Sequence, residues 1–108
     1  MKKIVYYQVK FEGVFNSAPT SMFPQKSFVD FHIAHKFAND CYERWKEDRM
    51  KSHAVKHERE IINDYEHKDC LGDYVRQITF RSENNYITLG FIRVIHNYLF
   101  LHEYMDVK

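Results

Sequence analysis

Apolar and polar residues alternate near the start of the chain. From Lys3 to Phe11 every second residue is Val, Tyr or Phe, and most residues on the opposite face are polar or tyrosine. A period of two predicts a β-strand in this segment. The following stretch, 16–24, is rich in Ser, Pro and Asn, which is typical of a surface loop.

After this loop the apolar spacing changes to three and four residues, which predicts an amphipathic helix. Ser27 and Asp30 fit a capping box, so we expect the helix to begin at Ser27. The apolar stripe lapses over 46–53 and resumes over 55–65, so either one helix bends or two helices meet, and Gly72 is the expected C-terminal stop. The stripe consists of Phe28, Phe31, Ala34, Phe37, Ala38, Cys41, Tyr42 and Trp45.

Three strand-like runs follow Gly72, at 74–81, 86–95 and 98–104, and the last two are separated by the pair His96-Asn97. Asn tolerates the left-handed conformation of a short hairpin turn, so this pair predicts a turn. The expected fold is a single α+β domain over residues 1–108. Its order is β-α-α-β-β-β, with an antiparallel sheet of about four strands and two helices, or one bent helix, packed on one face.

The run 86–95 is apolar on both of its faces, whereas a strand covered on one side only should alternate with polar residues. One explanation is shielding of the second face by neighbouring tyrosines, or by the loop that carries Met22 and Phe23. The other is a protein interface, because tyrosine supplies a large contact area at low entropic cost. The candidate interaction face consists of Tyr74, Arg76, Tyr86, Ile92, Arg93, Val94, Tyr98, His102 and Tyr104.

Composition narrows the functional classes. Aromatic residues make up 17% of the chain, so rings should dominate its core and any interface. The formal net charge is only +1, which gives no strong field to attract nucleic acid or an anionic membrane. No secretory signal or membrane-spanning run is present, which predicts a cytoplasmic protein, and the bias towards Lys, Asn, Ile, Phe and Tyr suggests a phage or mobile-element origin.

Candidate catalytic and metal-binding groups are sparse. The chain contains no phosphate-binding or nucleophile-elbow motif, and Cys41 and Cys70 are expected to be buried structural residues. His53 and His57 have the spacing of a metal pair on a helix but no evident third ligand, and His32 and His35 form a second group with Cys41. Seven histidines in a short chain produce such spacings by chance, so no metal or other cofactor is predicted.

The last three runs also carry basic residues beside aromatic ones. Arg76, Arg81 and Arg93 could bind phosphate while tyrosines stack on bases. In element order the chain is similar to the ribosome-dependent RNase toxins of the RelE type, and this resemblance implies an RNA-binding or RNase role. Those toxins are strongly basic, whereas this chain is nearly neutral.

Three hypotheses follow. The absence of catalytic motifs and the doubly apolar strand favour a small non-enzymatic protein of the inhibitor or adaptor type, which binds a protein partner through a Tyr-rich sheet face. The alternatives are an RNA-binding protein or RelE-like RNase, in which His102 or Arg93 is required for cleavage, and a self-associating structural protein.

Overall fold

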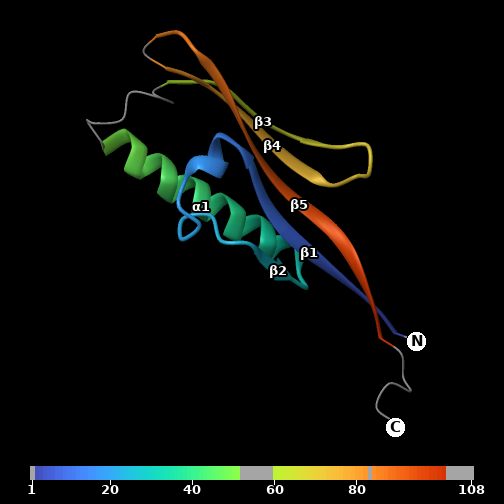
Figure 1. Ribbon diagram of the computed structural model, residues 1–108. Coiled ribbons are helices and arrows are strands. Elements are labelled where there is room, and N and C mark those ends of the chain that lie inside the picture. The colour runs from blue at the N-terminus through green and yellow to red at the C-terminus, as the bar shows by residue number, and fades with distance from the viewer. Residues whose placement is uncertain (1, 52–59, 83, 102–108) are drawn as a thin grey trace.

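The computed structural model describes residues 2–51, 60–82 and 84–101. In chain order its elements are β1 (Lys2–Gly13), the 3-10 helix η1 (Val14–Ser17), β2 (Lys26–Phe28), α1 (Phe31–Lys51), β3 (Glu60–Lys68), β4 (Tyr74–Arg81) and β5 (Ile87–Leu101). The strands form one antiparallel sheet in the order β2-β1-β5-β4-β3, and α1 lies along one face (Figure 1). The α+β class with an antiparallel sheet is confirmed, but the described part has five strands and one α-helix.

The two longest strands form the centre of the sheet. β1 contains the strand expected from Lys3 to Phe11 and pairs with β5 along its whole length. The turn expected at His96-Asn97 is wrong, because β5 continues through both residues, which pair with Tyr7 and Tyr6. The side-chain amide of Asn97 also donates to Gln8 Oε1 at 3.4 Å, so this residue stabilises the paired strands instead of a turn.

The helix begins at Phe31, four residues after the predicted start. Ser27 lies in β2, opposite Gln8 of β1, so the capping box is not formed. Asp30 caps the helix instead, since its Oδ1 accepts a hydrogen bond from the Ile33 amide at 3.2 Å. The predicted apolar stripe is confirmed from Phe31 onwards, and its buried members are Ala34, Ala38, Cys41, Tyr42 and Trp45.

The predicted helical segment after the lapse is a strand in the part that the structure describes. Residues 52–59 lie outside the described residues, and Glu60–Lys68 form β3, paired with β4. The register shifts between Ile61 and Asn63, which changes the alternation of side chains by one position and mimics helical spacing. Gly72 ends no helix and lies in the β3–β4 turn with φ +83°.

The core lies between α1 and one face of the sheet and is built largely from rings. Phe15 of η1 is central, with its ring centroid 5.1 Å from that of Trp45 and 5.0 Å from that of Phe23. Phe23 comes from the loop after η1, so this loop packs on the helix side and does not shield the opposite face. Burial raises the pKa of the Tyr42 hydroxyl to about 12, so it is neutral at physiological pH.

Candidate functional site

The predicted interaction residues do not form one surface. Tyr74, Ile92 and Val94 are buried beneath α1, so the expectation that their side chains lie on an exposed face is wrong. The pairing register places Arg93 on the opposite face. Both faces of β5 are apolar, and the sequence does not show which of them the helix covers. Arg76 lies on the helix side of the sheet, and Tyr98 lies on the same side, farther along β5. Tyr86 comes just before β5. His102 and Tyr104 lie outside the described residues.

The three arginines expected to bind phosphate each have a carboxylate partner. Arg76 makes a bidentate contact with Asp64, with Nε donating to Oδ1 at 2.9 Å and Nη2 to Oδ2 at 2.7 Å. This bond raises the pKa of the Arg76 guanidinium. Arg93 Nε lies 2.6 Å from Glu12 Oε1, and Arg81 Nη1 lies 3.6 Å from a carboxylate oxygen of Glu60. A phosphate would have to displace these carboxylates, so the arginines are not a ready anion site.

Among the described residues, the histidine and cysteine candidates do not gather into a metal site. In the described part of the chain no three His, Cys, Asp or Glu side chains are placed to hold an ion. His35 packs against the ring of Tyr74, with centroids 4.7 Å apart, and His32 is exposed. The pair His53 and His57 lies outside the described residues. Cys41 is buried as expected, whereas the expectation for Cys70 is wrong, because it is exposed on the β3–β4 turn.

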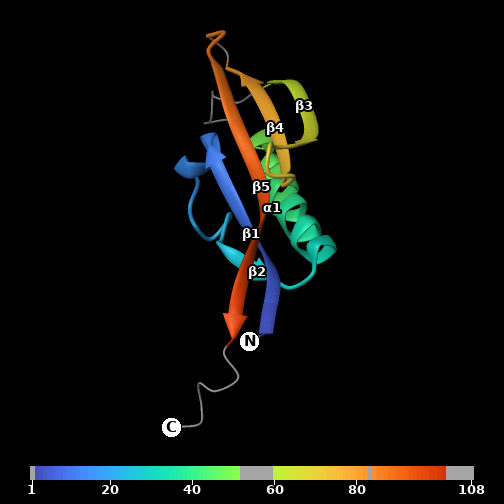
Figure 2. The ribbon, with the colours of Figure 1, turned by 90° about the vertical axis from the view of Figure 1, so that its right-hand side faces the viewer.

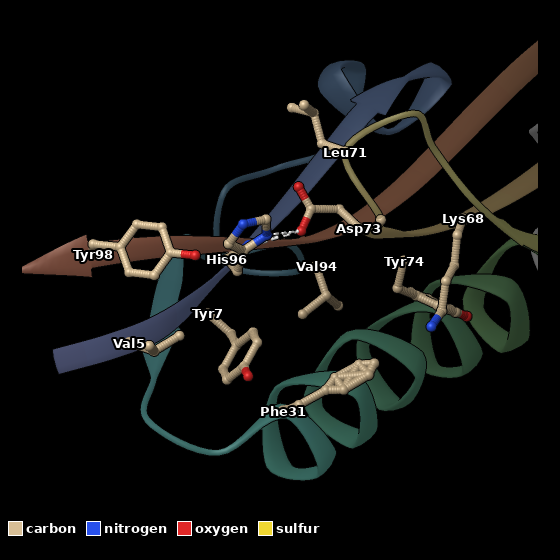
Figure 3. A pocket seen from close by; sticks show the side chains of 11 residues that line it. Val5, Tyr7, Phe31, Lys68, Leu71, Asp73, Tyr74, Val94, His96 and Tyr98 are labelled. Atoms are coloured by element: carbon tan, nitrogen blue, oxygen red, sulfur yellow. Dashed lines mark hydrogen bonds and ion pairs between the residues drawn. The ribbon is translucent and has the colours of Figure 1, made fainter. Parts of the chain in front are cut away.

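A pocket of about 450 Å³ opens on the helix side of the sheet, near the start of α1 (Figure 3). Its polar centre is the pair Asp73 and His96. Oδ1 of the buried Asp73 accepts the backbone amide of His96 at 3.0 Å and also contacts His96 Nδ1. Tyr7, Tyr74 and Tyr98 contribute rings to the lining. The pocket therefore combines one ordered histidine with a lining of aromatic and aliphatic side chains.

The β3–β4 turn positions Asp73. Asp69 Oδ1 accepts the backbone amides of Asp73 at 3.0 Å and Leu71 at 2.9 Å. These bonds lower the pKa of the Asp69 carboxyl, and the bond from the Asp73 amide has the largest effect. Gly72 supplies the left-handed conformation inside the turn. The Asp73 carboxylate, which orients His96, is thus held by a turn that is stabilised by hydrogen bonds between its own residues.

This geometry gives His96 a defined proton arrangement. A carboxylate only accepts hydrogen bonds, so Nδ1 of His96 carries the hydrogen and Nε2 of the neutral ring is the acceptor. Burial, with Glu66 nearby, raises the pKa of Tyr74 to about 12, so its hydroxyl stays protonated. Such a site can accept a proton at Nε2 or bind a hydroxyl donor. Asp73 was not singled out by sequence, because no local motif links residues that meet only when β4 and β5 pair.

The second candidate site is the uncovered face, which we define as the face of the sheet opposite α1. No described element packs on it (Figure 1). A polar band crosses its middle, where Gln8 contacts Asn97 and Glu12 contacts Arg93. On one side of this band lies an apolar patch of Ile87, Leu89 and Phe91. On the other side lie Ile4, Tyr6 and Leu99, while Ile95 pairs with Gln8 inside the band.

Within the described residues no helix is both long and apolar enough to span a membrane. Comparison of the chain with protein-family models, with curated proteins and with solved structures finds no match.

Proposed function

We propose that this chain binds a protein partner through the uncovered face, with the patch Ile87, Leu89 and Phe91 at the centre of the contact. The observation that supports this proposal is the exposure of neighbouring aliphatic side chains on a paired strand, with Ile87 53% and Leu89 40% exposed. Contiguous exposed apolar groups rimmed by polar residues are typical of binding surfaces.

The contact differs from the one expected from sequence in both position and chemistry. The Tyr-rich face expected from sequence is the face that α1 covers, where the Tyr74 side chain is buried in the core. The uncovered face offers Ile, Leu and Phe, flanked by the ion pair of Arg93 with Glu12. A partner that suits this surface presents its own apolar side chains, with polar groups at the rim that can meet the Arg93–Glu12 pair.

Site-specific photocrosslinking tests this function. A benzophenone amino acid is placed at Ile87 in one sample and at Ile33 of α1 in another, and each is exposed to lysate of the source organism. The two positions are matched, because Ile87 is 53% and Ile33 57% exposed, on different faces of the molecule. We expect a discrete adduct with another protein from position 87 only. Leu89→Lys should reduce its yield about tenfold, since a charge buried in an apolar contact costs more than about 1.4 kcal/mol.

Equal adducts from positions 87 and 33 would show that the contact is non-specific. Adducts that contain only copies of this chain would indicate self-association at this face and no binding of a different protein. Either result contradicts the proposal.

A second candidate function is RNA cleavage at the pocket, and it is the Asp73–His96 pair that favours it. His96 Nε2 would take the proton of a ribose 2′-hydroxyl as its oxygen attacks the phosphorus, and the 5′-oxygen would leave with a proton from solvent. Tyr7 and Tyr98 line the same pocket and offer rings for base stacking. In this candidate function Arg93 has no role in cleavage, because it is paired with Glu12 and Asp69.

Incubation of labelled RNA with the protein, with and without ribosomes, tests this candidate. If it is correct, His96→Gln abolishes cleavage and Asp73→Asn lowers the rate by roughly 10²-fold or more, in line with the usual contribution of a positioned base. His67→Gln is the matched control, because His67 is exposed on β3 and stacks on Tyr65 outside the pocket. A wild-type protein that cleaves no RNA under either condition eliminates this function.

A further inference from the structure

The ends of β1 and β5 extend beyond the rest of the sheet as a two-stranded ribbon (Figure 2). β4 pairs with β5 only as far as Val94, and β2 pairs with β1 only at Tyr7–Val9. The remaining part of β5, Ile95–Leu101, therefore has β1 on one side and no described strand on the other. Two strands alone are only marginally stable in water.

The open edge of β5 presents backbone hydrogen-bonding groups. Ser82 donates to the carbonyl of Tyr86, just before β5, and the amide of His96, within β5, donates to Asp73. The even-numbered residues on either side of the region paired with β4 therefore point their backbone groups towards the β4 side. In an antiparallel strand the N–H and C=O of alternate residues share a direction. The backbone groups of Tyr98 and Phe100 thus point out of the open edge, where no described residue meets them.

This edge lacks the features that usually keep strand edges apart. Ile95–Leu101 contains no charged residue and no proline, whereas the outer strand β3 contains Glu60, Glu66 and Lys68. Proteins commonly protect a free edge with charges or proline, or they cover it. Tyr98 is 47%, Leu99 49% and Phe100 53% exposed, so apolar side chains line both faces of the ribbon. The edge is therefore suited to being covered by another strand.

We propose that the covering strand is the same segment of a second copy, so that two chains form a symmetric dimer by antiparallel pairing of Ile95–Leu101. An antiparallel pair of identical segments is self-complementary about a two-fold axis. In each copy the β3–β4 turn at Asp73 blocks the inner end of the open edge of β5. A partner strand must therefore have an unpaired edge of similar length, and the same segment of a second copy has one. The segment itself contains no Lys, Arg, Asp or Glu, and the nearest recorded charge is the Lys3 ammonium of β1, 4.0 Å from the centroid of the Tyr98 ring.

The shape of the monomer agrees with this assembly. The radius of gyration is 17.3 Å and the extents are 61 × 28 × 19 Å. A compact chain of about 100 residues has a radius of gyration near 13 Å. The ribbon accounts for part of this elongation, and pairing with a second ribbon would give it the additional strands that it lacks. The dimer contact is separate from the patch at Ile87, which lies at the other end of β5.

Sedimentation equilibrium across a range of concentrations tests the dimer directly. We expect the wild type to have the mass of two chains at high concentration. Tyr98→Pro should raise the dissociation constant at least about tenfold, because it removes an outward amide that the monomer does not use. Tyr98→Ala is the matched control, since it removes the ring but keeps the amide and should retain most of the dimer. A wild type that stays monomeric throughout would overturn the proposal, as would equal weakening by both variants.

Amide hydrogen exchange of the wild type provides a second readout that needs no substitution. In the dimer the amides of Tyr98 and Phe100 should be protected, and dilution should expose them. The amides of Asn97 and Leu99 point towards β1 and should remain protected at both concentrations. Exchange at Tyr98 and Phe100 that is equally fast at every concentration contradicts strand pairing. The proposed function at Ile87 is unaffected by that result, because photocrosslinking measures it independently.

Discussion

Replacing Gly13 with alanine is expected to cost about 3–5 kcal/mol of unfolding free energy, as the sum of backbone strain and steric overlap. Gly13 has φ +72° and ψ −132°, a conformation that side chains with a Cβ rarely adopt. An added Cβ would also lie 2.2 Å from the carbonyl oxygen of Leu89. Because that oxygen belongs to the backbone of β5, relief requires movement of the strand. Urea unfolding followed by circular dichroism measures the loss.

Gly72→Ala is the matched control for this prediction. Gly72 has φ +83°, but an added Cβ would meet no atom within 4 Å. Its substitution should therefore show the backbone cost alone, about 1–2 kcal/mol. Equal losses in the two variants would mean that the close approach of Gly13 to β5 is absent in solution.

Substitution of Arg76 with alanine is expected to lower the unfolding free energy by about 2–3 kcal/mol, because a hydrogen-bonded charge pair loses one member. The Arg76 guanidinium has bidentate bonds to Asp64 and lies 4.5 Å from the centroid of the Tyr42 ring. Its side chain is only 16% exposed, so water replaces these contacts poorly. Arg76→Lys should recover less than half of the loss, since an ammonium cannot reproduce the bidentate geometry. Thermal and urea unfolding give both values.

Arg81→Ala provides the comparison, because the Arg81 side chain is 43% exposed and its ion pair with Glu60 is 3.6 Å long. Such a surface pair should contribute at most about 0.5 kcal/mol. If Arg76→Ala instead leaves stability unchanged and abolishes RNA or protein binding, Arg76 is a binding residue, as the sequence suggested. A purely structural role of Arg76 would then be wrong.

Local patterns predicted the elements whose signal lies within one segment. The strand from Lys3 to Phe11 and the helical stripe from Phe31 to Trp45 were both correct, because alternation and three-and-four spacing reflect one buried face each, whereas Phe28 lies in β2. The pattern misled at β3, where the register shift after Ile61 imitates helical spacing. It also misled at His96-Asn97, where strong pairing with β1 overrides the turn preference of Asn.

The candidate sites were less accessible to sequence reasoning. The doubly apolar character of 86–95 drew attention to β5, which carries the uncovered face, the pocket histidine and the open edge. Three of the chosen residues, Tyr74, Ile92 and Val94, are buried under α1, because a strand apolar on both faces does not indicate which face a helix will cover. Asp73 went unnoticed, since its partner His96 is 23 residues away and the contact exists only through strand pairing.

The sequence by itself determined the α+β class, the antiparallel sheet, the first strand and the apolar side of α1, all through periodicities of two and of three to four residues. Only the tertiary structure decided that β5 is a single long strand, that α1 covers Ile92 and Val94 of this strand, and that Asp73 meets His96. These features depend on pairing register and packing between distant segments. Such interactions depend on the free energy of the whole fold, so the local spacing of residues does not predict them.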